Sequence, residues 1–409
     1  MPVTADYCIN EEDLVDMKMI IGADVVPTES NRALFESGDI ISLVGEGLTE
    51  LLHAADYRIF NLEVPLCDQE KPIIKLGPHL IAPTKTVEGY KKLGANLLTL
   101  ANNHILDQGL YGLQSTIEAL DNAGIAYVGV GMNSEEASKA YTFAFAGKKI
   151  GIYACAEHEF SIADETRAGA NPFDPLESPD HVSQIKAACD YVIVLYHGGK
   201  EHYRYPSPKL QKVCRKLIQK GADLVICQHS HCIGCEEKYG NGTIVYGQGN
   251  FLFDASSSEF WQTSLLISIN ELFELEYIPI VRRENKVRLA SENEANKIMC
   301  SLMERSAQIK QPGFVEQKYK EFAKSMLSVY LKALSGKESI LFRALNKITG
   351  NSLRTRRLKR IYGKRQYLYI RNYVECEAHR ELLLAGVASM LVANEDKDCP
   401  CKVTEEEEC

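Results

Sequence analysis

The chain of 409 residues contains no uninterrupted apolar run that approaches the roughly 20 residues needed for a membrane-spanning helix. Its N-terminal residues are acidic where a secretory signal peptide would carry Lys or Arg, and no apolar core follows them. No tandem repeat of fixed period occurs either, which excludes a solenoid. From these absences we expect a protein without a transmembrane segment, located in the cytoplasm.

The cysteines also lack the pattern of a disulfide framework or of a paired zinc motif. There are thirteen of them, an odd number, scattered through apolar segments such as 153–155, which favours reduced, buried thiols. Five potential zinc ligands do crowd into a short stretch: Cys227, His229, His231, Cys232 and Cys235. A second, distant pair at the usual spacing is missing, so we interpret these cysteines as small apolar core residues.

The formal net charge of −9 excludes whole-molecule attraction to nucleic acid, which we do not expect as a partner. One segment opposes this charge, because residues 354–371 contain eight Lys or Arg residues, three interleaved tyrosines and no acid. These features suit an anionic polymer, a phosphorylated carrier or a membrane surface. A solvated helix, or pairing with the acidic residues 405–408, is the ordinary alternative.

Between residues 18 and 254, short apolar runs alternate with amphipathic stretches. The runs lie at 19–21, 57–60, 97–100, 149–153, 191–195 and 223–226. Because they are continuously apolar, they predict strands buried on both faces. The intervening stretches, such as 110–120 and 206–220, have apolar residues at helical spacing and end near a glycine. Together they indicate an α/β domain.

The pattern changes towards the C-terminus. Strand-like stretches at about 262–270 and 273–283 should complete a sheet, and beyond about residue 290 the periodicity becomes helical. We therefore divide the chain into an N-terminal segment (1–17), an α/β domain (18–288), a helical C-terminal region (289–393) and an acidic tail (394–409).

Side chains that can bind metal follow five of the predicted strands. They are Asp24, Asn61, Glu63, Asn102, Asn103, His104, Asp107, His197, Glu201, His229 and His231. Loops at the carboxyl ends of strands converge on one edge of an α/β sheet, so we expect these groups to meet there. A single histidine at such a place is more often structural, and a single asparagine caps or turns the chain. Five such endings at one edge favour a common site.

Imidazole, carboxylate and amide ligands together suit divalent Mn, Fe or Zn, and a set of this size can hold two ions. His229 and His231 are two residues apart, so both would point to the same side of an extended segment. His197 would then share an ion with them.

In their order along the chain, these motifs resemble the CapA family, named for capsule and poly-γ-glutamate synthesis, within the calcineurin-like metallophosphoesterase superfamily. The resemblance covers about residues 18–255. It rests on six blocks, at 22–24, 61–63, 100–109, 197–201, 229–231 and 249–251. It implies a four-layered α/β/β/α metallophosphoesterase-like sandwich, followed here by a helical C-terminal appendage.

The resemblance also implies roles for individual residues. Seven would bind metal: Asp24, Asn61, Glu63, Asn103, His197, His229 and His231. His104 resembles the residue that donates a proton to the leaving group or steadies the phosphoryl oxygens, and we predict that Asp107 is catalytic with it. Substrate contacts are predicted for Asn102, Gly199, Glu201 and Asn250.

We therefore predict a metal-dependent hydrolase of capsule or poly-γ-glutamate metabolism. Its substrate would be an anionic polymer or a phosphate-containing compound, and proteins of capsule or polymer synthesis would be its partners. The alternative is a non-catalytic CapA-like protein that binds an anionic polymer or scaffolds synthetase partners.

Overall fold

The computed structural model of the chain describes residues 17–254, 256–335, 338–376, 379–380, 382–384 and 386–387. The predicted acidic tail, and all of the predicted N-terminal segment except its last residue, lie outside these residues. The chain forms two compact units, one up to Phe322 and one from Ala323 onward.

The first unit is built around two β-sheets. The larger sheet contains β1 (Lys18–Val25), β2 (Tyr57–Leu62), β3 (Leu97–Thr99), β4 (Ala126–Val128), β13 (Asn250–Leu252), β14 (Thr263–Asn270), β15 (Leu275–Arg283) and β16 (Lys286–Leu289). The order along it is β16-β15-β14-β1-β2-β3-β4, and β13 pairs with β1. Strands β1 to β4 are parallel, whereas β14 to β16 are antiparallel to their neighbours.

The second sheet has the order β11-β12-β10-β9-β7-β6. Its strands are β6 (Tyr141–Phe145), β7 (Lys148–Ala156), β9 (Tyr191–His197), β10 (Leu224–Gln228), β11 (Glu236–Tyr239) and β12 (Gly242–Val245). The four strands β7, β9, β10 and β12 are parallel, so they share one carboxyl-terminal edge. A small separate sheet pairs β5 (Val130–Gly131) with β8 (Gly169–Ala170).

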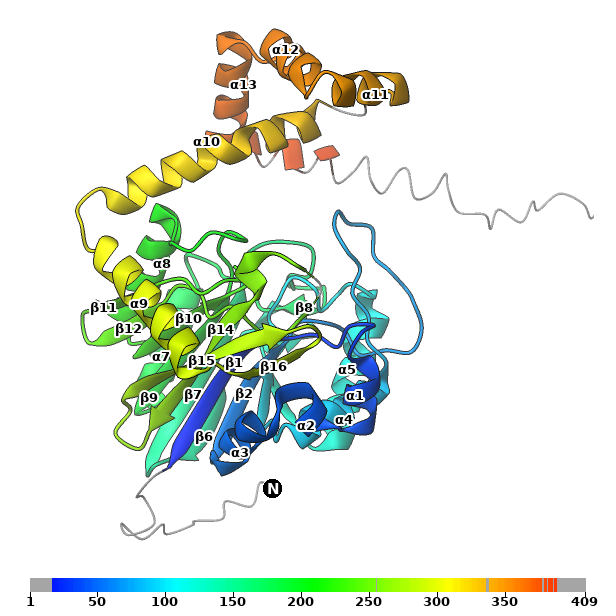
Figure 1. Cartoon of the computed structure of the whole chain (residues 1–409). Helices are drawn as coiled ribbons and strands as arrows, with labels where there is room; N and C mark the ends of the chain where they lie inside the picture. Colours follow the sequence, from blue (N-terminus) through cyan, green and yellow to red (C-terminus); the bar gives the residue numbers. More distant parts are fainter. Residues whose placement is uncertain are drawn as a thin grey trace, which may run out of the picture. The chain divides into compact units, whose positions relative to one another are not determined.

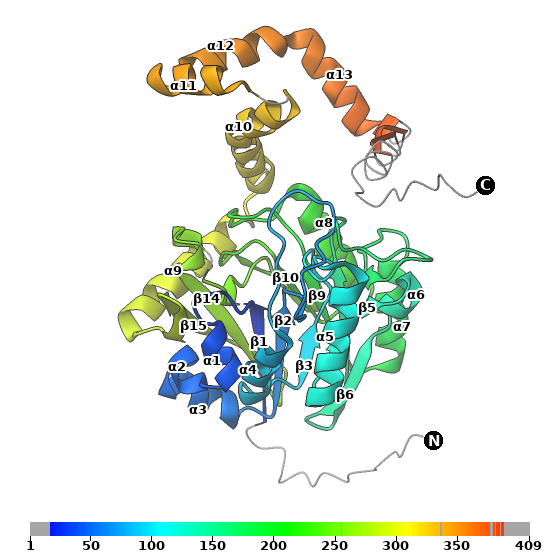
Figure 2. The ribbon, with the colours of Figure 1, turned by 90° about the vertical axis from the view of Figure 1, so that its right-hand side faces the viewer.

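The two sheets pack face to face, and helices cover their outer sides (Figures 1 and 2). Ile193 and Leu195 of β9 lie in the core between the sheets, whereas Val192 and Val194 belong to a second core under the helices. The helices beside the second sheet are α7 (Ser178–Ala188) and α8 (Pro208–Gln219). Those beside the first are α1 (Arg32–Ser37), α2 (Ile40–Val44), α3 (Glu46–Ala54), α4 (Val87–Lys92) and α5 (Gly109–Ala123). This arrangement confirms the predicted α/β/β/α sandwich.

Local sequence explains where these helices begin and end. Ser207 caps α8 by accepting a hydrogen bond from the N–H of Leu210, and Pro208 occupies the first turn, where no partner for its nitrogen is needed. Gly124 ends α5 with a left-handed φ of 70°, which a residue with a side chain rarely adopts. Three short elements complete the unit: η2 (Thr84–Thr86), α6 (Ser134–Ala137) and η3 (Glu259–Trp261).

The C-terminal part is helical, as predicted. Its helices are α9 (Glu292–Gln308), α10 (Phe314–Leu334), α11 (Ile340–Ile348), α12 (Ser352–Ile361) and α13 (Lys364–Glu375). Helix α9 contacts β15 and β11 and therefore belongs to the first unit, and α10 crosses the division at Phe322. The predicted domain boundary at 288 marks the change to helices, and the domain assignment itself stays a prediction. Among the described residues, no helix is both long and apolar enough to cross a membrane.

Replacement of Leu195 by alanine tests the packing of the two sheets. The side chain is buried between them, so its removal leaves a cavity, and we expect the free energy of unfolding to fall by about 2–5 kcal/mol. Denaturant titration measures this change. The exposed Leu176→Ala control should change it by less than about 0.5 kcal/mol. An equal effect of both substitutions would contradict this packing.

Candidate metal centre

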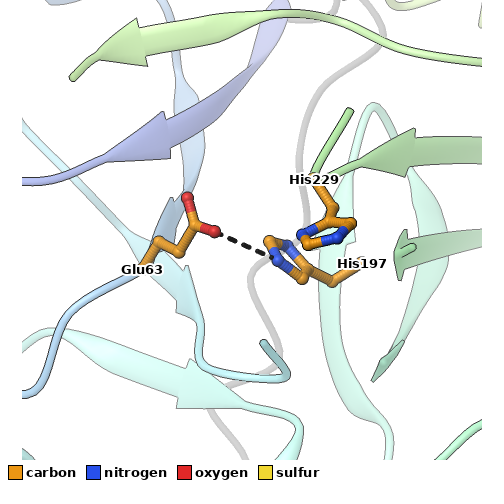
Figure 3. A group of neighbouring side chains, drawn as sticks. All are labelled: Glu63, His197 and His229. Carbon is orange, nitrogen blue, oxygen red and sulfur yellow. Dashed lines mark ion pairs between the residues drawn. The ribbon is translucent and has the colours of Figure 1, made fainter. Parts of the chain in front are cut away.

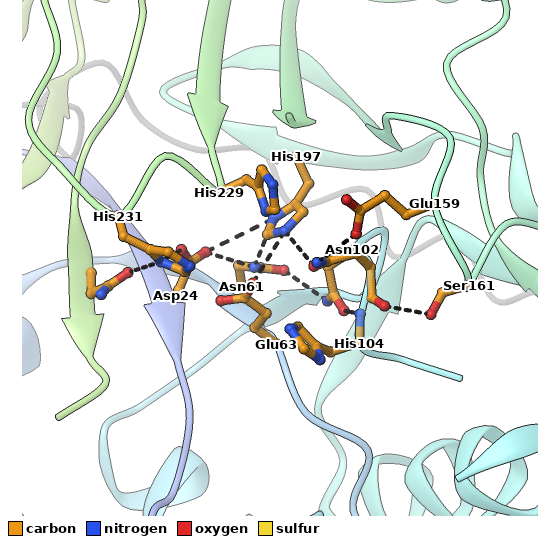
Figure 4. A network of polar contacts seen from close by, with 12 residues as sticks. Asp24, Asn61, Glu63, Asn102, His104, Glu159, Ser161, His197, His229 and His231 are labelled. Carbon is orange, nitrogen blue, oxygen red and sulfur yellow. Dashed lines mark hydrogen bonds and ion pairs between the residues drawn. The ribbon is translucent and has the colours of Figure 1, made fainter. Parts of the chain in front are cut away.

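The candidate metal centre lies where the carboxyl-terminal ends of the two sheets face each other (Figure 4). The first sheet contributes Asp24 from β1 and Glu63, which follows β2. The second contributes His197 at the end of β9, and His229 and His231 after β10. All five side chains are buried. The expectation that one sheet edge gathers these groups is therefore wrong, because two sheets supply them.

A β-bulge places Asp24 at this edge. Ile21 pairs with Ile59, but Asp24 pairs with Asn61, so β1 has one more residue than β2 between the two pairs. Asp24 is also in register with Asn250 of β13 on its other side. The extra residue turns the Asp24 carboxylate into the space between the sheets, where the histidines lie.

The five side chains form two overlapping groups of potential ligands. Glu63, His197 and His229 make up the first (Figure 3), and Asp24, Glu63 and His231 the second. Within each group, one ligand atom per residue lies within 4.8 Å of the others. Nε2 of His197 is 3.2 Å from Oε1 of Glu63, and Nδ1 of His231 is 3.7 Å from Oδ2 of Asp24. Glu63 belongs to both groups, so its carboxylate is common to the two sets of potential ligands.

Four polar atoms of this cluster are buried without a hydrogen-bond partner. They are Oδ2 of Asp24, Oε1 and Oε2 of Glu63 and Nδ1 of His229. The contact between Glu63 and His197 is thus a close approach and not a hydrogen bond. Each buried atom left unpaired costs about 1–3 kcal/mol, and more if it is charged. Cations held by the two ligand groups would give these atoms partners, so the residues present fit divalent metal.

Burial also sets the protonation of these groups. It raises the pKa of Asp24 to about 8, an effect increased by the charge of Glu63, and it raises the pKa of Glu63 to about 7. Burial lowers the pKa of His231 to about 3 and also lowers the pKa of His197 and of His229. The imidazoles are therefore neutral and can bind a metal, whereas the carboxyl groups must release protons when they do so.

The structure brings Asn61 into the centre, but its amide is engaged by protein groups. Nδ2 donates a hydrogen bond of 2.7 Å to Oδ1 of Asp24 and lies 3.3 Å from Nδ1 of His197. Oδ1 accepts hydrogen bonds from Thr99 and Asn102. Asn61 therefore orients the Asp24 carboxylate beside the predicted ligands.

The two asparagines after β3 have different surroundings. Asn102, a predicted substrate contact, is fully buried, and its amide bonds the carbonyl of Leu62 (2.8 Å) and the N–H of His104 (3.1 Å). It holds the turn. Asn103, a predicted ligand, places Oδ1 at 3.1 Å from Nε2 of His197 and so borders the centre.

His104 and Asp107, the predicted catalytic pair, are in contact. Oδ2 of Asp107 accepts hydrogen bonds of 2.6 Å from both Nδ1 of His104 and the N–H of Leu80, and Lys75 binds its other oxygen. Both Lys75 and Asp107 are buried, whereas the His104 side chain is 12% exposed. Asp107 therefore positions the imidazole, and only His104 can reach a substrate.

The remaining predicted substrate contacts are divided between the centre and the loop after β9. Oδ1 of Asn250 lies 2.8 Å from Nδ1 of His231. Gly199 lines a cavity of about 620 Å³, and its N–H donates a hydrogen bond to Glu157. Glu201 is exposed, and its charge raises the pKa of Glu63. Asn250 is thus the one of these three that contacts a predicted ligand.

Sequence reasoning missed an acidic pair after β7. Glu157 and Glu159 form a third group of potential ligands with His229, whose Nε2 lies 3.8 Å from Oε1 of Glu157. Glu159 accepts a 2.9 Å hydrogen bond from Nδ2 of Asn103, which turns Oδ1 of that amide towards His197. The apolar run at 149–153 followed by these acids is the same signal that marks the other strand ends.

The backbone carrying His229 and His231 differs from the prediction. Strand β10 ends at Gln228, and the two histidines have left-handed φ values of 76° and 52°. The extended segment expected for them is therefore wrong. Their ring centroids nevertheless lie 5.9 Å apart, because the turn directs both side chains into the centre.

The fold and the centre define an α/β/β/α protein with a buried His and carboxylate cluster between its sheets. The family model described as "Bacterial capsule synthesis protein PGA_cap" matches residues 20–255, more than half of the chain, so the chain belongs to this family. This match confirms the predicted relation to CapA proteins.

Individual relatives agree with this assignment. The chain is 30% identical over 212 residues to capsule biosynthesis protein CapA of Bacillus anthracis, covering 50% of this chain and 52% of that protein. It is 27% identical over 217 residues to PGA biosynthesis protein CapA of Bacillus subtilis (strain 168), covering 50% and 55%. The chain thus spans about half the length of these curated relatives. A novel phosphatase from Mycoplasma pneumoniae has 15% identity and a TM-score of 0.40, covering 67% of this chain and 95% of its own.

The raised pKa of Asp24 predicts how the stability of the metal-free protein depends on pH. A carboxyl group whose pKa is raised by folding stabilises the protein at low pH, and this contribution is lost as the pH rises through the folded value. Between pH 3.8 and about 8 we expect the free energy of unfolding to fall more steeply in the parent than in Asp24→Asn. Denaturant titrations in chelator measure both slopes. The exposed Asp121→Asn control should retain the parent slope, and equal slopes in all three proteins would refute the assignment.

Proposed function

We propose that the protein is a metal-dependent hydrolase of capsule or poly-γ-glutamate metabolism, acting on an anionic polymer or a phosphate-containing substrate. The observation that carries the proposal is the set of buried, unpartnered oxygen and nitrogen atoms of Asp24, Glu63 and His229. Membership of a capsule-synthesis family and the names of the CapA relatives support the metabolic setting.

Five side chains would hold the metal: Asp24, Glu63, His197, His229 and His231. Neutral imidazoles together with carboxylates suit Mn, Fe or Zn, and the two ligand groups that share Glu63 suit two ions. Bound there, the metal supplies Lewis-acid activation of the scissile group and of the attacking water. Asn61 fixes the Asp24 carboxylate for this role, and Asn103 borders the His197 face.

The proton needed by a leaving group comes from His104 in this proposal. Asp107 accepts the hydrogen bond from Nδ1, which leaves Nε2 of the imidazole to give or take a proton. Lys75 binds the other oxygen of Asp107 and so holds this carboxylate in place beside His104. Polymer and synthesis proteins as partners, and a cytoplasmic location, stay predictions.

Removal of metal ligands tests the proposal directly. Protein purified without chelator should contain Mn, Fe or Zn, and His197→Ala and His229→Ala should each lower metal content and hydrolysis at least about tenfold. Elemental analysis measures the metal, and a chromogenic phosphodiester and poly-γ-glutamate are the substrates assayed. The His53→Ala variant, altered at a histidine on the outer helix α3, should match the parent.

The non-catalytic alternative makes the opposite prediction. Metal-free protein whose His197→Ala and His229→Ala variants bind poly-γ-glutamate as the parent does, without turnover, would refute the hydrolase. Calorimetric titration with the polymer distinguishes this outcome from a simple loss of folding.

His104→Asn should separate proton transfer from metal binding. Because the imidazole is not among the metal ligands, we expect metal content to be retained while kcat falls about 10²–10⁴-fold. Asp107→Asn should lower kcat by less and shift its pH dependence, since it acts only by positioning the imidazole. Loss of metal from His104→Asn, or an unchanged kcat, would contradict this role.

A further inference from the structure

Exposed apolar side chains are concentrated in the second compact unit. Nine large apolar side chains are exposed among the described residues up to Phe322, whereas eighteen are exposed among the far fewer described residues after it. In the described part of the second unit, Leu331 and Tyr362 are the large apolar residues that are buried. A unit with so little core and so much exposed apolar surface indicates a surface that is covered when the protein functions.

Helix α11 shows how this surface is arranged. Leu341, Leu345 and Ile348 recur at helical spacing on one side, and Ile340 beside them is 78% exposed. The opposite side faces into the unit, where the buried Asn346 bonds the side chain of Asn351 and the N–H of Arg354. The apolar side of α11 therefore faces away from the unit, while the hydrogen bonds of Asn346 hold the other side of the helix in place.

Basic side chains accompany this apolar face. Between residues 338 and 376 there are ten Lys or Arg residues and two acids, a formal charge of +8 in a chain whose net charge is −9. Lys347 of α11 is exposed at the edge of its apolar side, next to Ile340 around the helix, and Arg356, Lys359, Arg360 and Lys364 are exposed on the helices that follow. Such a helix, apolar on one side with basic neighbours, is typical of segments that lie in a membrane interface.

Other occupants fit this surface less well. A second copy docked through the same surface would bring the same positive charge against it, which repels, and a purely polyanionic ligand would leave Leu341 and Ile348 exposed. An anionic lipid surface satisfies both features, because its headgroups attract the basic side chains and its acyl boundary accepts the apolar ones.

We infer that the second unit is a peripheral membrane-binding module that docks on anionic lipid through the apolar side of α11 and the basic residues around it. We define this as the α11 surface: Ile340, Leu341, Leu345, Lys347 and Ile348 of α11, with the exposed Arg356, Lys359 and Arg360 of the contacting helix α12. Its role is to hold the chain at the membrane, and it does not depend on the metal centre.

Sedimentation of the full chain with vesicles tests this inference. At low salt we expect binding to phosphatidylcholine vesicles that contain phosphatidylglycerol, no binding to phosphatidylcholine alone, and weaker binding as salt is added. Two variants address the two halves of the surface, Leu341→Ser/Ile348→Ser and Arg356→Gln/Lys359→Gln/Arg360→Gln. Each should weaken binding at least about tenfold.

The matched control is Leu176→Ser/Leu272→Ser, which removes two equally exposed leucines from the first unit and should bind as the parent does. Circular dichroism verifies that all variants are folded. Absence of binding to anionic vesicles would overturn the inference. So would parent-like binding by Leu341→Ser/Ile348→Ser, because the surface would then be a simple polyanion site, best examined with soluble poly-γ-glutamate.

Discussion

The central constraint on the site is that carboxylates and imidazoles are buried between the two sheets, and several of their polar atoms have no hydrogen-bond partner in the protein. Burial is the main cause that raises the pKa of the Asp24 and Glu63 carboxyl groups well above their ordinary values, and neighbouring negative charges add to it. A bound cation would reverse this, because it would stabilise the ionised carboxylates and the neutral imidazoles can bind it. Among the surrounding groups, Asn61 orients Asp24 and Glu159 orients Asn103 through hydrogen bonds.

The aromatic core explains why these groups stay in place. Phe60 of β2 stacks on Phe251 of β13 at a centroid distance of 5.2 Å, and both strands flank β1. Only glycine fits at position 22, because a Cβ there would lie 2.5 Å from the Phe60 ring. The tight packing at Gly22 and the bulge that follows it thus fix the three strand ends carrying Asp24, Glu63 and Asn250.

The continuously apolar runs were sufficient to predict the buried strands that carry the site, including β1, β2, β9 and β10. The four layers were predicted from the resemblance to the CapA family, and the acidic pair after β7 was not predicted. The sequence did not show which of these residues would position other side chains and which would face the site. Asn102 and Asp107 look like reactive groups in the sequence, yet their roles follow from hydrogen bonds to Leu62 and His104 that only the folded chain reveals. Lys75 lies in a loop without any periodic pattern, so nothing in the sequence connects it to Asp107.

The left-handed backbone at His229 and His231 has a consequence for the evolution of this protein. For residues with a Cβ, that conformation costs about 1–2 kcal/mol, whereas for glycine the cost is close to zero. At both positions glycine would remove this backbone cost, but it would also remove the imidazole. The backbone conformation alone therefore does not explain why histidines occupy this turn, whereas a function for their imidazoles does.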